Sequence, residues 1–301
     1  MAKQPRIGFI GAGRAGTALA VALAEAGYEV VAVASRSRAS AEALARRLPG
    51  ARAVAAAQDV VDTCDLIFLT VPDDQIRPVV EGLHWREGVA VVHTSGVETR
   101  DALRAALAQG AETGSLHPLQ TFAGLEGGAG KLRGAVMAVE AEGALRERLL
   151  EIVSGIGATP IELRAEDKAL YHASAVLVSN YVVTLSKLAS DLWLRFGWER
   201  PAALRALAPL LRGAVENIET LGLPAALTGP VARGDVATVR RHIEALTDAA
   251  PALLDVYRAL GLETIPLALA KGGLDETAAK QLRDLFSDKV EAVLEGTQKN
   301  E

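Results

Sequence analysis

Hydrophobic and polar positions follow two different patterns along the chain of 301 residues, and the change falls near residue 164. Before that position, short apolar runs rich in β-branched residues alternate with alanine-rich stretches whose apolar residues recur every three or four positions. This alternation predicts βαβ units around a parallel sheet. Strands are predicted at residues 6–10, 29–34, 66–71, 89–93, 112–116, 135–139 and 159–162, with a weak strand near 52–55. Several of these runs are apolar throughout, as expected when helices cover both faces of a sheet.

After residue 164 the pattern is helical almost throughout, as far as residue 294. Turn clusters interrupt it at residues 222–224, 228–235 and 272–275, and no strand pattern is found. We therefore predict an α/β domain over residues 1–164, followed by an all-α domain over residues 165–301.

A glycine-rich segment lies between the first predicted strand and the first helix, and it reads Gly11-Ala12-Gly13-Arg14-Ala15-Gly16. Glycines at this spacing permit a tight turn, a close approach of a pyrophosphate to the backbone, and close helix–strand packing. The N-terminus of the following helix offers free N–H groups and a positive dipole end to phosphates. This strand–loop–helix context predicts a Rossmann-like dinucleotide-binding domain, whereas the glycines alone would also suit an ordinary turn.

The end of the second predicted strand bears on the choice between NAD and NADP. NAD enzymes usually place an acidic residue there to bind the ribose 2′-hydroxyl, but this chain reads Ser35-Arg36-Ser37-Arg38. Two guanidinium groups and two hydroxyls suit a 2′-phosphate, which predicts NADP(H). Alternatively, both arginines are solvated loop charges, with Ser37 or Ser40 as a helix N-cap. Other strand ends of this sheet also face the nucleotide in such folds, which adds Val71, Pro72 and Thr94.

Three polar clusters are candidates for chemistry. Two follow strands, His93-Thr94-Ser95-Gly96 and the segment from Ser115 to Phe122, which includes His117. Ligands bind outside the carboxyl ends of strands in such sheets. A single histidine at a strand end is nevertheless often structural.

The third cluster opens the helical half, where Lys168, His172 and Ser179 share one helix face. The rest of that helix is small and apolar, so we expect it to be buried. Burial would lower the pKa of Lys168 towards the range useful for proton transfer. Alternatively, Lys168 is an exposed first-turn residue after Glu166 and Asp167.

Composition narrows the class of protein. The apolar and charged fractions of 50% and 23% are typical of a soluble globular chain, and the net charge of −5 argues against nucleic-acid binding. The single cysteine, Cys64, excludes internal disulfides and cysteine-based zinc sites, and no metal site is predicted. No apolar stretch reaches the roughly 18 to 20 residues that a membrane helix needs. The first residues show no signal-peptide pattern, so we expect a cytoplasmic protein.

Five motifs together resemble one bacterial family, which joins a Rossmann-like NADP-binding domain to a helical domain of unknown function, DUF2520. They are Gly-Ala-Gly-Arg-Ala-Gly, His-Thr-Ser-Gly, His-Pro-Leu-Gln-Thr-Phe, Lys-x-x-Tyr-His-Ala-x-Ala, and Leu-Thr-Gly-Pro-x-x-Arg-Gly-Asp, and they span about residues 5 to 295. More distantly, the chain is similar to the superfamily of β-hydroxyacid dehydrogenases, ketopantoate reductases and pyrroline-5-carboxylate reductases. Ser95-Gly96 and Lys168 match that superfamily, although His172 stands where many relatives have Asn.

This resemblance implies NADPH-dependent reduction of a small carbonyl compound, with ketopantoate, a 2-oxo acid, as the best single guess. Lys168 or His172 would donate a proton to the developing alkoxide, and His117, Ser95 and Arg233 would orient the substrate. Relatives usually pair through their helical domains, so a homodimer is expected. Imine reduction of the pyrroline-5-carboxylate type and a regulatory protein that binds NADP without turnover remain alternatives.

Overall fold

The computed structural model describes residues 4–124 and 128–287, and its first half is built on one sheet of eight strands. The strand order is β3-β2-β1-β4-β5-β6-β7-β8. The strands are β1 (Ile7–Ile10), β2 (Val30–Ala34), β3 (Arg52–Ala53), β4 (Leu66–Leu69), β5 (Ala90–His93), β6 (Glu112–Pro118), β7 (Val136–Glu140) and β8 (Thr159–Glu162). All the strands predicted from the hydrophobic pattern are present, including the weak one.

The sheet departs from the expected parallel arrangement at one pairing, because β6 and β7 are antiparallel. A parallel neighbour needs a long crossover connection, usually a helix. The connection from residue 119 to 135 contains, in its described part, only the single 3₁₀ turn Gly130–Leu132. The register sets His93 opposite Ser115 and Ser115 opposite Glu140, so these three residues lie level across β5, β6 and β7.

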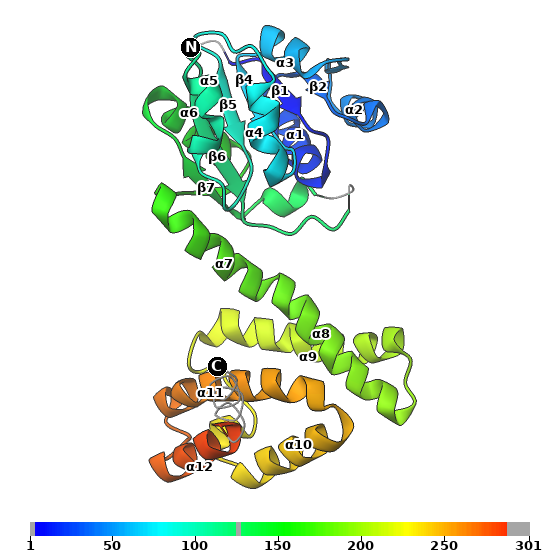
Figure 1. Ribbon diagram of the computed structural model, residues 1–301, viewed down its shortest axis with the longest axis vertical. Coiled ribbons are helices and arrows are strands. Elements are labelled where there is room, and N and C mark those ends of the chain that lie inside the picture. The colour runs from blue at the N-terminus through cyan, green and yellow to red at the C-terminus, as the bar shows by residue number, and fades with distance from the viewer. Residues whose placement is uncertain (1–3, 125–127, 288–301) are drawn as a thin grey trace, which may run out of the picture. The chain divides into compact units, whose positions relative to one another are not determined.

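Helices cover both faces of this sheet (Figure 1). They are α1 (Arg14–Glu25), α2 (Arg38–Ala45), α3 (Ala57–Thr63), α4 (Asp73–Glu81), α5 (Arg104–Leu107) and α6 (Gly143–Gly155). Successive strand residues point to opposite faces, so Leu66 and Phe68 of β4 join one buried cluster while Ile67 and Leu69 join another. The continuous apolar runs in the sequence are thus explained by two cores, one on each face.

The second half of the described chain is helical. After α7 (Lys168–Val178) come α8 (Asn180–Trp193), α9 (Arg200–Leu221), α10 (Val236–Ala249), α11 (Pro251–Lys271) and α12 (Glu276–Ser287). A separate core, which includes Val239, Ile265, Leu282 and Phe286, packs α10, α11 and α12 together. None of the helices in the described residues is long and apolar enough to span a membrane.

Packing divides the chain into two compact units, residues 1–180 and 181–301. Helix α7 therefore belongs to the sheet-containing unit, although the sequence division at residue 164 places it with the helical half. Figure 1 shows its N-terminal end meeting the sheet. The expectation that α7 is buried is wrong, because Lys168 is its only buried residue and Leu170 and Val178 are each 77% exposed. An apolar pattern marks a face that can be buried, but it does not show how much of the helix reaches a partner.

Candidate active site

The glycine loop after β1 is shaped by contacts with Thr70, which follows β4. Gly11 has φ +108°, a conformation that favours glycine, and a Cβ there would lie 2.4 Å from the carbonyl oxygen of Thr70. A Cβ on Gly16 would lie 2.3 Å from Thr70 Oγ1, which itself donates a 2.8 Å hydrogen bond to the carbonyl oxygen of Gly11. A Cβ on Gly13, by contrast, would meet no atom within 4 Å. Two glycines thus allow close packing, and Gly13 leaves open space above the loop.

A cavity of about 780 Å³ lies beside this loop, along the ends of β1, β2 and β4. Eight of the predicted cofactor-binding residues line it: Gly11, Ala12, Gly13, Ser35, Arg36, Ser37, Val71 and Pro72. The others, Arg14, Ala15, Gly16, Arg38 and Thr94, do not line it. Thr70 and Gln75 also line the cavity. Thr70 belongs to the strand end that was expected to face the nucleotide, whereas Gln75 was not predicted, although it follows the same strand.

The two arginines after β2 are in different situations. Arg36 is a wall residue of the cavity and the only charged one among the described residues that line it. Arg38 forms an exposed ion pair with Glu42, 2.8 Å between Nε and Oε1. Ser37 lines the cavity and also caps α2, its hydroxyl accepting a 3.2 Å hydrogen bond from the backbone N–H of Ser40. The capping alternative is therefore correct for Ser37, and of the two arginines only Arg36 lines the cavity.

The residues of the cavity fit the pyrophosphate of a dinucleotide. No side chain caps the N-terminus of α1, and its first turn contains no acidic residue. The N–H groups of that turn and the positive end of the helix dipole are thus available to an anion. The open space above Gly13 gives the anion room to approach the backbone.

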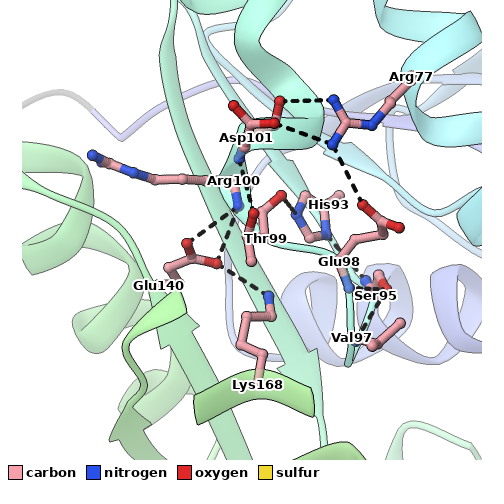
Figure 2. A network of polar contacts seen from close by, with 10 residues as sticks. All are labelled: Arg77, His93, Ser95, Val97, Glu98, Thr99, Arg100, Asp101, Glu140 and Lys168. Atoms are coloured by element: carbon pink, nitrogen blue, oxygen red, sulfur yellow. Dashed lines mark hydrogen bonds and ion pairs between the residues drawn. The ribbon is translucent and has the colours of Figure 1, made fainter. Parts of the chain in front are cut away.

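Lys168 is buried at the sheet end of α7, and its ammonium group binds two strands. Its Nζ donates hydrogen bonds to Ser115 Oγ on β6, at 2.6 Å, and to Glu140 Oε2 on β7, at 3.2 Å. Figure 2 shows the lysine side chain pointing at the Glu140 carboxylate. Only 3% of the lysine side chain is exposed, so the alternative of an exposed first-turn residue is wrong.

Glu140 links Lys168 to the loop after β5. Its carboxylate accepts hydrogen bonds from the backbone N–H of Arg100, at 3.1 and 3.2 Å to the two oxygens, and from Ser115 Oγ at 3.3 Å. Burial lowers the pKa of Lys168, while the charge and hydrogen bond of Glu140 act in the opposite direction. Glu140 was not predicted as a site residue. The signal that could have identified it is an acidic side chain directly after the apolar run 135–139.

His93 and Ser95 hold the loop after β5 in place. The backbone N–H of Ser95 donates to His93 Nδ1 at 3.2 Å, and His93 Nε2 donates to the carbonyl oxygen of Thr99 at 3.1 Å. Ser95 Oγ accepts from the backbone N–H groups of Val97 and Glu98 at 3.3 and 3.0 Å (Figure 2). Burial, with a further contribution from Lys168, lowers the pKa of His93 to about 3. Both side chains are thus engaged in shaping the loop that carries Gly96.

His117 and His172 meet around Gly96. Their ring centroids are 6.0 Å apart, and a Cβ on Gly96 would lie 2.6 Å from His172 Cδ2 and 2.9 Å from His117 Nε2. His117 Nδ1 is 2.9 Å from the hydroxyl oxygen of Tyr171. Burial, then His172 and Lys168, lowers the pKa of His117 to about 4, so this ring is neutral at pH 7.

The structure therefore groups three of the four predicted catalytic residues, Lys168, His172 and His117, at the junction of α7 with β6, and places Ser95 next to Gly96. Ser179, predicted on the same helix face, instead caps the end of α7 by donating to the carbonyl oxygen of Ala175 at 2.6 Å. Arg233 lies in the other compact unit, in the 3₁₀ turn Val231–Arg233.

Two family models match the chain. A Rossmann-like domain matches residues 2–118, and the domain of unknown function DUF2520 matches residues 135–264. The chain thus matches the Rossmann-like model in its first part and the DUF2520 model in its second. Ser95, Ser115 and His117 come from the Rossmann-like match, whereas Glu140, Lys168 and His172 come from the DUF2520 match. The residues around Lys168, called the lysine cluster below, thus come from both family matches.

Solved structures share this Rossmann-like and helical fold. A candidate NADP oxidoreductase of Bacteroides fragilis, BF3122, is 25% identical with a TM-score of 0.69, covering 87% of this chain and 98% of that one. Protein TM1727 of Thermotoga maritima is 26% identical with a TM-score of 0.63, covering 79% and 90%. The 1-pyrroline-5-carboxylate reductase of Streptococcus pyogenes shares the fold at 16% identity, with a TM-score of 0.57 and coverage of 93% and 99%.

A curated relative is also similar to part of the chain. The glycerol-3-phosphate dehydrogenase [NAD(P)+] of Nocardia farcinica is 35% identical over 122 residues. The match covers 37% of this chain and 34% of the dehydrogenase, so this chain spans about a third of that relative's length.

Proposed function

We propose that this protein is an NADPH-dependent oxidoreductase that reduces the carbonyl group of a small substrate, with 2-oxo acids such as ketopantoate as the first class to test. The observation that carries the proposal is the buried ammonium group of Lys168, which is bound to Ser115 and Glu140. It lies in the same unit as the cavity beside the glycine loop, whose residues fit a dinucleotide. The similarity to a candidate NADP oxidoreductase supports it.

The preference for NADP(H) over NAD(H) rests on the charge of the cavity wall. None of the described residues that line the cavity is acidic, and Arg36 supplies the one positive charge. A carboxylate at the end of β2 would bind a ribose 2′-hydroxyl, whereas a guanidinium binds a 2′-phosphate. Ser35, Ser37 and Ser40 add hydroxyl groups at the same position.

When bound, NADPH supplies the hydride that adds to the carbonyl carbon of the substrate. Negative charge then develops on the carbonyl oxygen, and a positioned cation or proton donor stabilises it. Lys168 is our first choice for the donor because Glu140 and Ser115 hold its ammonium group in one place. His172, half-buried beside His117, is the second choice.

The test is a screen for NADPH oxidation over 2-oxo acids and cyclic imines, followed by kinetics of Lys168→Ala and His172→Ala. A proton donor contributes typically about 10² to 10⁴ in rate, so the donor's variant should lose that much kcat while its NADPH affinity stays unchanged. Full turnover by Lys168→Ala would remove Lys168 from this role. Retained thermal stability and NADPH binding would show that the variant is folded.

Imine reduction is the second candidate, favoured by the charge state of the cluster. His117 is neutral at pH 7, and the charge of Lys168 is paired with that of Glu140. A protonated imine needs no proton from the enzyme, so this arrangement suits it as well. Turnover of cyclic imines that survives Lys168→Ala would favour it. Binding of NADPH without turnover of any carbonyl or imine compound would instead indicate a regulatory protein.

We also propose that two copies pair through the helical unit. Large apolar side chains are exposed along α8 and α9 in the single chain, among them Val183 (71%), Leu210 (73%) and Leu221 (57%). Apolar surface of this extent on a soluble protein indicates an interaction site. Light scattering after gel filtration should give the mass of a dimer, and Leu210→Glu should reduce it to that of a monomer. A monomeric native protein would contradict the pairing.

A further inference from the structure

The two ring nitrogens of His117 have different surroundings. Nδ1 lies 2.9 Å from the hydroxyl oxygen of Tyr171, and the two rings meet edge to face at 5.5 Å. Nε2 points at Gly96, where even a methyl group would lie 2.9 Å away, and no hydrogen bond links it to a described residue. One nitrogen is therefore committed to the protein, and the other borders the glycine loop.

The chemistry of the pair decides which atom carries the proton. A phenol hydroxyl is a good donor and its oxygen a weak acceptor, whereas the unprotonated nitrogen of a neutral imidazole is a strong acceptor. Burial raises the pKa of Tyr171 to about 12, which keeps its hydroxyl protonated. Burial beside His172 and Lys168 keeps His117 neutral, with a pKa of about 4. The hydrogen bond therefore runs from the Tyr171 hydroxyl to Nδ1, and the imidazole proton sits on Nε2.

We propose that Tyr171 is a positioning residue that fixes His117 in its Nε2–H form, so that His117 is a neutral hydrogen-bond donor for the carbonyl oxygen of the substrate. The role of His117 as a donor to the substrate rests on the proposed carbonyl reduction, whereas the assignment of its Nε2–H form does not. A neutral donor suits this site because a second cation beside Lys168 would be repelled. A fixed N–H aimed at a developing oxyanion lowers the barrier without reorganisation.

His93 offers an internal comparison. It is also in the Nε2–H form, because its Nδ1 accepts from the backbone N–H of Ser95 and its Nε2 donates to the carbonyl oxygen of Thr99. Both of its nitrogens are thus occupied by the protein. His117 has the same tautomer with its donor end left for a ligand, which is the difference expected between a structural and a substrate-binding histidine.

The first experiment measures the tautomer and needs no substrate. Nitrogen-15 spectra of histidine-labelled full-length protein distinguish protonated from unprotonated ring nitrogens, and His117→Gln identifies the His117 signals. We expect an unprotonated Nδ1 and a protonated Nε2 at pH 7, with a shift of the Nδ1 signal in Tyr171→Phe. A proton on Nδ1, or a His117 spectrum unchanged in Tyr171→Phe, would overturn the proposal.

The helical unit provides a matched control. There, His242 Nδ1 lies 2.8 Å from the hydroxyl of Tyr257 in a similar edge-to-face pair. Tyr257→Phe should shift the His242 signal and leave both the His117 signals and the activity unchanged. A change in the His117 spectrum of Tyr257→Phe would mean that the tyrosine variants act through general structural effects, and it would overturn the assignment to Tyr171.

The second experiment uses the substrate found by the NADPH-oxidation screen. We expect His117→Ala to lower kcat about 10²-fold, in the range measured for loss of one oxyanion donor. His117→Gln should recover part of this loss, because its amide N–H can replace the Nε2–H. Unchanged kcat in His117→Ala would overturn the substrate role, while the spectra would still decide the tautomer. Failure of the whole screen would count against the proposed function alone.

Discussion

Lys168 shows at the level of a single residue how the fold keeps a charge inside the protein. A buried ammonium group is costly unless it is paired and hydrogen-bonded. Here Glu140 supplies the opposite charge, and Ser115 supplies a second acceptor. The backbone N–H of Arg100 binds the same carboxylate, so the loop after β5 is tied to the position of the lysine.

Glu140→Gln is predicted to move the pH range in which the enzyme is active. Glu140 raises the pKa of Lys168 against the lowering effect of burial. Removing that negative charge lowers the pKa further, by about 1 unit or more for a close opposite charge. If protonated Lys168 is the active form, activity is lost as the pH rises through its pKa, so the alkaline limb of kcat should move to lower pH by that amount. Glu140→Asp, which keeps the negative charge, should leave the limb close to its native position. Coincident limbs in Glu140→Gln and the native enzyme would contradict the role.

Arg36 and Arg38 form a matched pair for testing the cofactor. Arg36 lines the cavity, whereas Arg38 is exposed and paired with Glu42. Arg36→Ala is predicted to raise the Kd of NADPH about tenfold or more, as expected for the loss of a charged hydrogen bond worth about 1.5–3 kcal/mol. The Kd of NADH should hardly change. Arg38→Ala should leave both constants within about twofold. Fluorescence titration measures all of these values, and equal losses for the two cofactors would contradict a contact with the 2′-phosphate.

At the scale of elements, the proposed dinucleotide site beside the glycine loop depends on the approach of α1 to the end of β4. Gly16 lies against Thr70, and Thr70 in turn is hydrogen-bonded to the carbonyl oxygen of Gly11. This packing holds the loop and the first turn of α1 beside the cavity. Gly13 is part of the same loop but faces open space, so the two glycines have separable roles.

Gly13→Ala and Gly16→Ala are therefore predicted to fail in different ways. Gly13→Ala should fold normally and bind NADPH at least about tenfold more weakly, because its methyl group would occupy space that the fold leaves for the pyrophosphate. Gly16→Ala should lose about 1–3 kcal/mol of stability through overpacking against Thr70. Thr70→Ala, which removes the Oγ1 that lies 2.3 Å away, should recover part of that loss in the double variant. Chemical denaturation and NADPH titration separate the two effects, and equal stability of the two single variants would count against this account.

The hydrophobic pattern predicted the strands well, because the central strands β1, β4 and β5 are buried on both faces and their apolar runs are a clear signal. The direction of β7 could not be predicted, since it depends on a connection without a crossover helix rather than on the strand's own residues. This limit explains why Glu140 was missed. It lies 28 residues before Lys168 in the chain, and only the antiparallel register with β6 sets it level with Ser115. Lys168 itself could be predicted, because a charged residue in an otherwise apolar helix can be recognised from the sequence of that helix alone.

At the scale of the whole molecule, the two family models and the two compact units divide the chain differently. The DUF2520 match begins at residue 135 and includes β7, β8 and α7 as well as most of the helical unit. Packing instead keeps the chain together as far as residue 180. Strand β7 and helix α7, which carry Glu140, Lys168 and His172, fall within both the DUF2520 match and the unit of residues 1–180.

The unit of residues 1–180 contains two neutral histidines, the buried His93 and the partly buried His117, and this predicts how its stability depends on pH. The pKa values of His93 and His117 are lowered from 6.5 to about 3 and about 4. Below pH 6.5 the unfolded chain takes up protons that the folded unit does not, so stability is lost as the pH falls. Each histidine contributes a slope of about 1.4 kcal/mol per pH unit, down to its folded pKa.

His117→Gln should therefore reduce the slope of unfolding free energy between pH 6 and pH 4.5 by about 1.4 kcal/mol per unit, with no change in slope between pH 7.5 and 8.5. The three tryptophans allow this to be measured in the right unit, because Trp85 is buried beside the sheet whereas Trp193 and Trp198 belong to residues 181–301. In a Trp193→Phe/Trp198→Phe background, Trp85 fluorescence follows denaturation of the sheet-containing unit alone. An unchanged acid slope in His117→Gln would show that His117 takes up its proton in the folded state, and it would also remove the neutral donor proposed for the substrate.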